Sequence, residues 1–341
     1  MHIGPEEYVE NLYASHAPEY GFRARTIEEC RAWRDRLKEA FTRDLGGFPG
    51  EKTALHPRVV EETECGGYVR QRVVITTDEL LDMPLYLLIP KGCEGRLPVV
   101  ITCPGHGTGS RDNVGLNPDG TFKSGDQGYS KSFALELVKR GFLVVSPELL
   151  GFAERMFQGD MNRWPEVRNS CHRLSTYLMT MGKTMAGVRV YELMRVIDYL
   201  ETRPEADAGR IGCMGISGGG WVCAFTTALD ERIRAAVVSG YTNTFKKSIL
   251  AMQHCICNFV PGLALHAEMP DLIAMIAPRP LLIEAGERDR NFPMDGVREA
   301  LEKLETVYGA WNARDRLERD LFDGGHEISG RMAYDWLARW L

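Results

Sequence analysis

Short apolar runs alternate with amphipathic stretches along most of this chain, from about residue 98 onward. Five runs are mostly apolar, at positions 98–103, 142–146, 211–216, 235–239 and 280–284, and a sixth strand is expected at 317–322. Such runs are typical of strands that are buried on both faces of a parallel sheet. Between them, apolar residues recur at helical spacing at 130–140, 186–200, 221–229, 294–308 and 332–340. The alternation predicts the α/β class, with a mostly parallel sheet covered by helices on both faces.

The first 66 residues follow a different pattern. Residues 1–25 are mixed in character, and we expect them to form an irregular arm. Thr26 and Glu29 have the spacing of a capping box and should begin a helix. An apolar stripe follows at helical spacing, formed by Cys30, Trp33, Leu37, Phe41 and Leu45. Because such a stripe needs a surface to pack on, we predict that residues 1–66 form an arm and a helix packed on the main domain.

Residues 67–341 are expected to form one α/β domain, which this chain length can support. Two strands at 68–76 and 83–89, joined by a short polar turn, precede the alternating region. The connection at 149–185 is long and irregular. Connections of this length inside a compact fold are usually functional, so we interpret it as a lid-like insertion.

The strand at 211–216 leads into a serine on a glycine-rich turn. Residues 215–219, G-I-S-G-G, fit the G-x-S-x-G pattern, in which small neighbours allow the sharp turn that exposes the serine. The amide of Gly218 would lie at a helix N-terminus, where it could bind a developing oxyanion together with the backbone of His106. Glycine is frequent here, at 35 of 341 residues, so the pattern can arise by chance. The catalytic interpretation of Ser217 therefore depends on partners elsewhere.

Two other strand ends carry the partners that a serine nucleophile needs. Asp289 and His326 each follow a predicted strand, and in open α/β sheets the site lies beyond the carboxyl ends of the strands. An imidazole can act as a base near neutral pH, and a carboxylate fixes its tautomer. The order Ser217, Asp289, His326 is that of α/β-hydrolase triads. The acidic alternatives to Asp289 are Glu284, Glu287 and Asp295.

Three further residues are candidates for the substrate pocket. Glu148 follows a central strand and should lie near the rim of the site, where it could bind substrate hydroxyls or pair with Arg155. We favour the pairing. Trp164 and Trp221 could form walls of the pocket, although an aromatic side chain is more often part of the core.

Several motifs resemble those of one enzyme family. They are C-P-G-H-G at Cys103, P-E-L-L-G-F-A-E-R at Pro147, M-A-G-V-R-V-Y-E at Met185, G-I-S-G-G-G at Gly215, H-C-I-C-N-F-V-P-G-L at His254, A-P-R-P-L-L-I-E-A-G-E-R-D-R-N-F-P at Ala277 and G-G-H-E at Gly324. Over nearly its whole length the chain is similar to α/β-hydrolases of the dienelactone-hydrolase and acetyl-xylan-esterase-like group. Dienelactone hydrolases proper use a cysteine nucleophile, whereas Ser217 stands here. The resemblance therefore implies serine esterase chemistry on small acyl esters, such as acetyl groups on a carbohydrate.

Two other functions remain as alternatives. A peptidase or amidase on the same fold usually needs an extra domain or a large cap, and only the 149–185 segment is available for that role. A non-catalytic interaction protein is the third alternative, but such relatives typically lose a triad member and all three are present here.

Composition excludes several classes of partner. The net charge of −6 does not suggest a nucleic-acid-binding face. No apolar run reaches the roughly 20 residues of a membrane helix, and no secretory signal is visible at residues 1–7. Nine cysteines, an odd number, favour reduced thiols in a cytoplasmic protein. The arm before Thr26 could reach a neighbouring subunit in a homo-oligomer.

We expect neither a metal nor another cofactor. The cluster His254-Cys255-Ile256-Cys257 invites a zinc interpretation, but zinc needs about four ligands and no second cluster lies at a suitable spacing. No phosphate-binding loop or dinucleotide fingerprint is present. The expected partner is a small-molecule ester, with an acylated sugar as one option.

Overall fold

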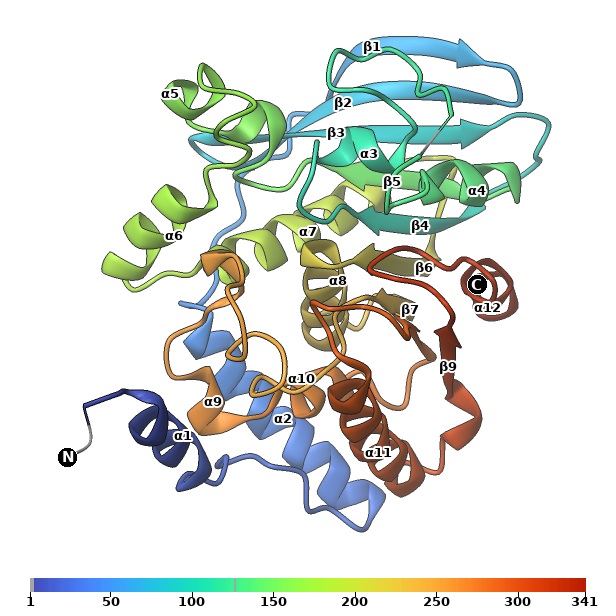
Figure 1. Ribbon diagram of the computed structural model, residues 1–341. Coiled ribbons are helices and arrows are strands. Elements are labelled where there is room, and N and C mark those ends of the chain that lie inside the picture. The colour runs from blue at the N-terminus through green and yellow to red at the C-terminus, as the bar shows by residue number, and fades with distance from the viewer. Residues whose placement is uncertain (1–2, 126) are drawn as a thin grey trace.

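A computed structural model describes residues 3–125 and 127–341 of the chain (Figure 1). Nine strands form one sheet in the spatial order β1-β2-β3-β5-β4-β6-β7-β8-β9. The strands are β1 (Arg58–Cys65), β2 (Tyr68–Asp78), β3 (Leu81–Pro90), β4 (Leu97–Cys103), β5 (Leu143–Pro147), β6 (Ala206–Ile216), β7 (Ile233–Ser239), β8 (Leu281–Gly286) and β9 (Leu317–Phe322). The six strands from β5 to β9 along this order are parallel, while β1, β2 and β3 form an antiparallel meander that joins β5.

Helices lie on both sides of the sheet (Figure 1). The longer helices are α1 (Glu6–Ala14), α2 (Ile27–Asp44), α4 (Phe133–Lys139), α6 (Cys171–Thr180), α7 (Met185–Glu201), α8 (Gly218–Leu229), α10 (Met269–Ala274), α11 (Met294–Ala310) and α12 (Ala333–Trp340). The shorter ones are α3 (Ser110–Asn113), α5 (Gln158–Met161), α9 (Leu263–His266), and the 3-10 turns η1 (Ala153–Arg155), η2 (Ile256–Asn258) and η3 (Arg314–Arg316).

The core consists of two apolar layers separated by the sheet. Val99 and Ile101 of β4 pack in the layer that contains α2, α7, α8 and α11, whereas Val100 packs in the layer that contains α4 and α12. Successive side chains of a strand point to opposite faces, so a continuously apolar strand is needed wherever both faces are covered. The predicted α/β class and the mostly parallel sheet are therefore confirmed.

The N-terminal region differs in two respects from the sequence-based expectation. The arm contains a helix, α1, and an additional strand, β1, precedes the predicted pair. Neither element shows the periodic apolar pattern from which helices and strands are predicted, because neither has a buried face. The helix α1 has no buried residue, and β1 is a largely exposed edge strand. The helix α2 begins as predicted, with the capping box of Thr26 and Glu29, and its Phe41 ring contacts Phe225 of α8 edge-on at 4.9 Å.

The segment 149–185 is more helical than expected. It contains η1, α5 and α6. Arg155 of η1 forms a two-pronged pair with Glu192 of α7, at 2.5 and 2.8 Å, and both side chains are almost completely buried. This ion pair fastens the beginning of the segment to a core helix.

Candidate active site

Ser217 stands on a strained turn between β6 and α8. Its backbone has φ 56° and ψ −121°, which is rare for a residue with a side chain. The turn is tight on both sides, because a Cβ on Gly215 would lie 2.2 Å from the carbonyl oxygen of Gly219, and a Cβ on Gly219 would lie 2.0 Å from that of Cys103. The Ser217 amide donates to the carbonyl of Ser239 at 3.0 Å. Only glycine fits at positions 215 and 219. The turn exposes Ser217 at the end of the sheet.

Asp289 and His326 are in direct contact, although 36 residues of chain lie between them. His326 Nδ1 lies 2.7 Å from Asp289 Oδ2. The other carboxylate oxygen of Asp289 accepts hydrogen bonds from the amides of Asn291 (2.8 Å) and Phe292 (3.2 Å). The Asp289 side chain is 1% exposed, against 20% for His326. A buried carboxylate held by two amides can orient the imidazole and leave its other nitrogen free for proton transfer.

Packing restricts the orientation of the His326 ring. The ring is stacked on Phe292 at 5.8 Å and 17°, and on Tyr129 at 6.0 Å and 15°. Gly240 approaches it from β7, and a Cβ there would lie 3.2 Å from His326 Cε1. These three neighbours were not anticipated. Phe292 lies three residues after Asp289 and could have been suspected, whereas no local pattern singles out Tyr129 or Gly240.

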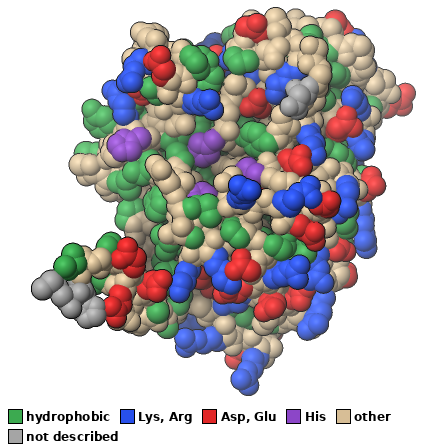
Figure 2. All heavy atoms as spheres, in the orientation of Figure 1, with side chains coloured by type: hydrophobic (Ala, Val, Ile, Leu, Met, Phe, Trp, Pro, Cys, Tyr) green, Lys and Arg blue, Asp and Glu red, His purple; other side chains and the backbone are tan. Residues whose placement is uncertain are grey.

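Ser217 and His326 line the same pocket, which has a volume of about 430 Å³. Its wall also contains the amide side chains of Gln253, Asn258 and Asn291. Figure 2 shows histidine side chains gathered in the middle of this face, where the surface is hollowed. The Ser217 hydroxyl has no hydrogen-bond partner within residues 3–125 and 127–341, so it is available to a ligand.

The two residues whose backbone amides are expected to bind an oxyanion both lie at this pocket. His106 and Gly218 both line it, and neither amide has an acceptor in the described part of the chain. The His106 ring packs directly on Gly218, because a Cβ there would lie 2.8 Å from His106 Nδ1. The Tyr129 hydroxyl donates to the carbonyl of His106 at 2.9 Å and so holds the loop. Amides that are free and preorganised can stabilise a developing negative charge.

The expectations for Glu148 were wrong. Its side chain is fully buried and accepts hydrogen bonds from the amide and hydroxyl of Ser110, the latter at 2.7 Å. Arg155 donates to the backbone carbonyl of Glu148, and its ion-pair partner is Glu192. Burial raises the pKa of Glu148. The Glu148 side chain therefore supports the loop after β4 and is not among the residues that line the pocket.

The two tryptophans do not line this pocket either. Trp221 is fully buried in the core on the first turn of α8, so the alternative interpretation as a core residue applies. Trp164 is 42% exposed and lines a separate cavity of about 330 Å³ with Thr108, Met156 and Met161. Trp164 stands in the polar stretch N-R-W-P-E and Trp221 in an apolar one, but neither sequence context shows which pocket, if any, the side chain lines.

A parallel sheet with a serine on a strained strand-to-helix turn defines the α/β-hydrolase fold. The chain belongs to the Abhydrolase family, whose model matches residues 1–307. The resemblance noted from the sequence motifs is thereby confirmed at the level of the fold and the superfamily.

Relatives of known name or structure match most of the chain. The "Putative hydrolase YtaP" of Bacillus subtilis (strain 168) is 29% identical over 320 residues, covering 90% of this chain and 99% of that protein. A crystal structure of a "putative acetyl xylan esterase" from Bacteroides fragilis has a TM-score of 0.78 at 19% identity, over 94% and 82% of the two chains. A glucuronoyl esterase from Solibacter usitatus has a TM-score of 0.63 at 16% identity, over 90% of each chain.

Within the described residues, no helix has the length and apolar character required to cross a membrane.

Proposed function

We propose that this protein is a carboxylic ester hydrolase that works through an acyl-enzyme on Ser217. The observation that carries the proposal is the pocket that Ser217 shares with His326, together with the 2.7 Å contact between His326 and Asp289. Membership of the Abhydrolase family and the names of the structural relatives support the same activity.

The chemistry follows from these positions. Asp289 holds the His326 tautomer whose other ring nitrogen can accept the Ser217 proton while the hydroxyl oxygen attacks the ester carbonyl. The amides of Gly218 and His106 stabilise the oxyanion of the tetrahedral intermediate. The intermediate collapses, His326 gives its proton to the departing alcohol, and an acyl group remains on Ser217. Water, deprotonated by His326, then attacks the acyl carbonyl. The bond between the acyl carbon and Ser217 Oγ breaks, His326 returns the proton to Oγ, and the acid is released.

We propose a small acyl group on a polar alcohol, such as an acetylated sugar, as the substrate. The amide side chains of Gln253, Asn258 and Asn291 at the pocket can hydrogen-bond to sugar hydroxyls. The acetyl-xylan-esterase relative supports this class. A pocket of about 430 Å³ accommodates a small ester better than an extended peptide, which argues against the peptidase alternative.

The decisive experiment replaces the nucleophile. Ser217→Ala should reduce kcat/KM on p-nitrophenyl acetate by on the order of 10³-fold or more, because the chemical step loses its attacking group. A fluorophosphonate probe should label wild type and the surface control Ser15→Ala, but not Ser217→Ala. Wild-type turnover by folded Ser217→Ala would refute the proposal. The kcat/KM values for a panel of acetylated sugars, methyl glucuronate esters and aminoacyl anilides would then show which alcohol and acyl groups the enzyme prefers.

We also propose that the protein acts in a reducing compartment, which is consistent with the cytoplasm. All nine cysteines are free thiols. Disulfides would be expected to form among neighbouring thiols in an oxidising environment. Mass mapping of thiols in protein purified without reductant from its native cells would test this location.

A further inference from the structure

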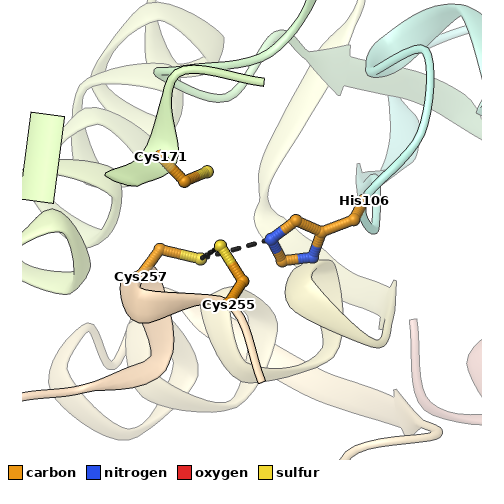
Figure 3. A group of neighbouring side chains, drawn as sticks. All are labelled: His106, Cys171, Cys255 and Cys257. Carbon is orange, nitrogen blue, oxygen red and sulfur yellow. Dashed lines mark hydrogen bonds between the residues drawn. The ribbon is translucent and has the colours of Figure 1, made fainter. Parts of the chain in front are cut away.

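Four metal-ligating side chains meet beside the proposed active site (Figure 3). His106 comes from the loop after β4, Cys171 is the first residue of α6, and Cys255 and Cys257 lie at η2. Their donor atoms all lie within 4.8 Å of one another. Cys257 Sγ is 3.3 Å from both His106 Nε2 and Cys255 Sγ. Figure 3 shows the three sulfur atoms and the imidazole edge pointing into one common space.

These separations match the edges of a tetrahedral zinc site. With Zn–S and Zn–N bonds of about 2.3 and 2.0 Å, ligand atoms on one zinc ion lie roughly 3.5–3.8 Å apart. The observed donor distances, from 3.3 Å to no more than 4.8 Å, bracket that value. Cys171 and Cys257 are fully buried, so the centre is shielded from water. Thiolates and imidazole are also the donor set that zinc prefers.

A buried cation next to the cluster provides an independent argument. The Arg189 side chain is fully buried, and its Nη2 lies 3.3 Å from Cys171 Sγ. It also donates to the neutral carbonyl of Leu150 and lies over the rings of Phe152 and Trp221, and no carboxylate forms a salt bridge with it in the described part of the chain. Buried charges require a counter-charge. A zinc ion with three thiolates and a neutral imidazole carries one negative charge, which balances the single positive charge of Arg189.

We propose that His106, Cys171, Cys255 and Cys257 bind one structural zinc ion. All four positions of the tetrahedron are taken by side chains, so no open position is left for a substrate, and the ion acts by holding the chain. It joins the loop after β4, the α6 segment and η2, which are far apart in the sequence. Metal binding itself does not depend on the proposed esterase activity.

The site has a consequence for the proposed chemistry through the position of one residue. His106 would bind zinc through Nε2, while its ring packs on Gly218 and the residue lines the pocket. His106 is thus a positioning residue, because a fixed ring sets where its own amide points. The zinc would also anchor the 149–185 segment through Cys171.

The four residues come from three separate segments, which is why the sequence did not predict a metal site. The sequence has no second cluster at a suitable spacing from His254-Cys255-Ile256-Cys257, but the structure supplies His106 and Cys171 as single residues from two other segments. His254, which seemed part of the motif, lies apart from the cluster and packs against Phe292 at 5.4 Å.

Metal analysis tests the proposal directly. Protein expressed with zinc in the medium and purified without chelator should contain about one equivalent of zinc per chain by mass spectrometry. Cys257→Ser should lower that content to below about a tenth of wild type. Cys223→Ser is the matched control, since Cys223 is equally buried but lies outside the cluster, and it should retain the metal.

Cobalt substitution provides a readout that needs neither a variant nor activity. Wild-type protein loaded with Co²⁺ should develop thiolate-to-cobalt charge transfer and the visible bands of a tetrahedral site. If reduced wild-type protein binds no metal after incubation with zinc, the proposal is overturned. Loss of esterase activity in Ser217→Ala with zinc retained would separate this proposal from the catalytic one.

Discussion

Gly240 offers a sharp test of the proposed catalytic base, because it touches His326 without taking part in the chemistry. It follows β7 with φ +53°, a conformation that favours glycine. An alanine Cβ there would lie 3.2 Å from His326 Cε1, 3.3 Å from Nδ1 and 3.7 Å from Asp289 Oδ2. Ordinary contacts of a Cβ are 3.4–4 Å. Gly240→Ala should therefore push the imidazole away by a few tenths of an ångström.

The expected effects have two parts. The left-handed backbone costs about 1–2 kcal/mol of folding stability when a side chain is added. The displaced ring meets Phe292 and Tyr129, on which it is stacked, so the shift also misaligns the base with Ser217. A misplacement of about 1 Å can cost on the order of 100-fold in rate. A shift of the His326 ring by a few tenths of an ångström should then lower kcat roughly tenfold.

Gly66→Ala separates these two parts. Gly66 has φ +60° and no atom within 4 Å of an added Cβ, so this variant carries the backbone cost alone. Both variants should show similar losses in urea unfolding, but only Gly240→Ala should lower kcat on p-nitrophenyl acetate. Equal kcat values for folded Gly240→Ala and Gly66→Ala would refute the placement of His326 as the base.

Three further outcomes follow from buried groups. Asp289→Asn should lower kcat by on the order of 10⁴-fold with little change in stability, as the imidazole loses its tautomer and its charge partner; a loss below tenfold would contradict this role. Arg155→Met leaves Glu192 buried and unpaired, and should cost about 3–5 kcal/mol in urea unfolding, whereas Arg155→Met combined with Glu192→Met should recover much of the loss. An unfolding free energy equal to that of wild type for the single variant would contradict the buried pair. Burial raises the pKa of Glu268 from 4.5 to about 7, so the folded state holds a proton that the unfolded chain has released. Stability should fall as the pH rises from about 4.5 to about 7 and then level off, and Glu268→Gln should flatten this slope in urea titrations; an unchanged slope in the variant would assign the pH dependence to other groups.

Local patterns in the sequence determined the class of fold and the candidate triad. Continuous apolar runs require a sheet covered on both faces, and helical stripes identify the covering layers. The glycines around Ser217 are required by backbone contacts within the turn and with the neighbouring strand end. This requirement is visible in the sequence as the G-x-S-x-G pattern. Asp289 and His326 could be proposed as partners of Ser217, because each follows a strand and the carboxyl ends of parallel strands lie at one edge of the sheet.

Tertiary packing decided what lies around those residues. Glu148 turned inward to Ser110, Trp221 entered the core, and Tyr129 stacked on His326, because each environment is made by segments remote in sequence. Cys171 and His106 meet Cys255 and Cys257 for the same reason. Periodicity and short motifs report the neighbours within one element, whereas a pocket wall or a shared ligand sphere depends on the three-dimensional register of several elements, which only the folded chain sets.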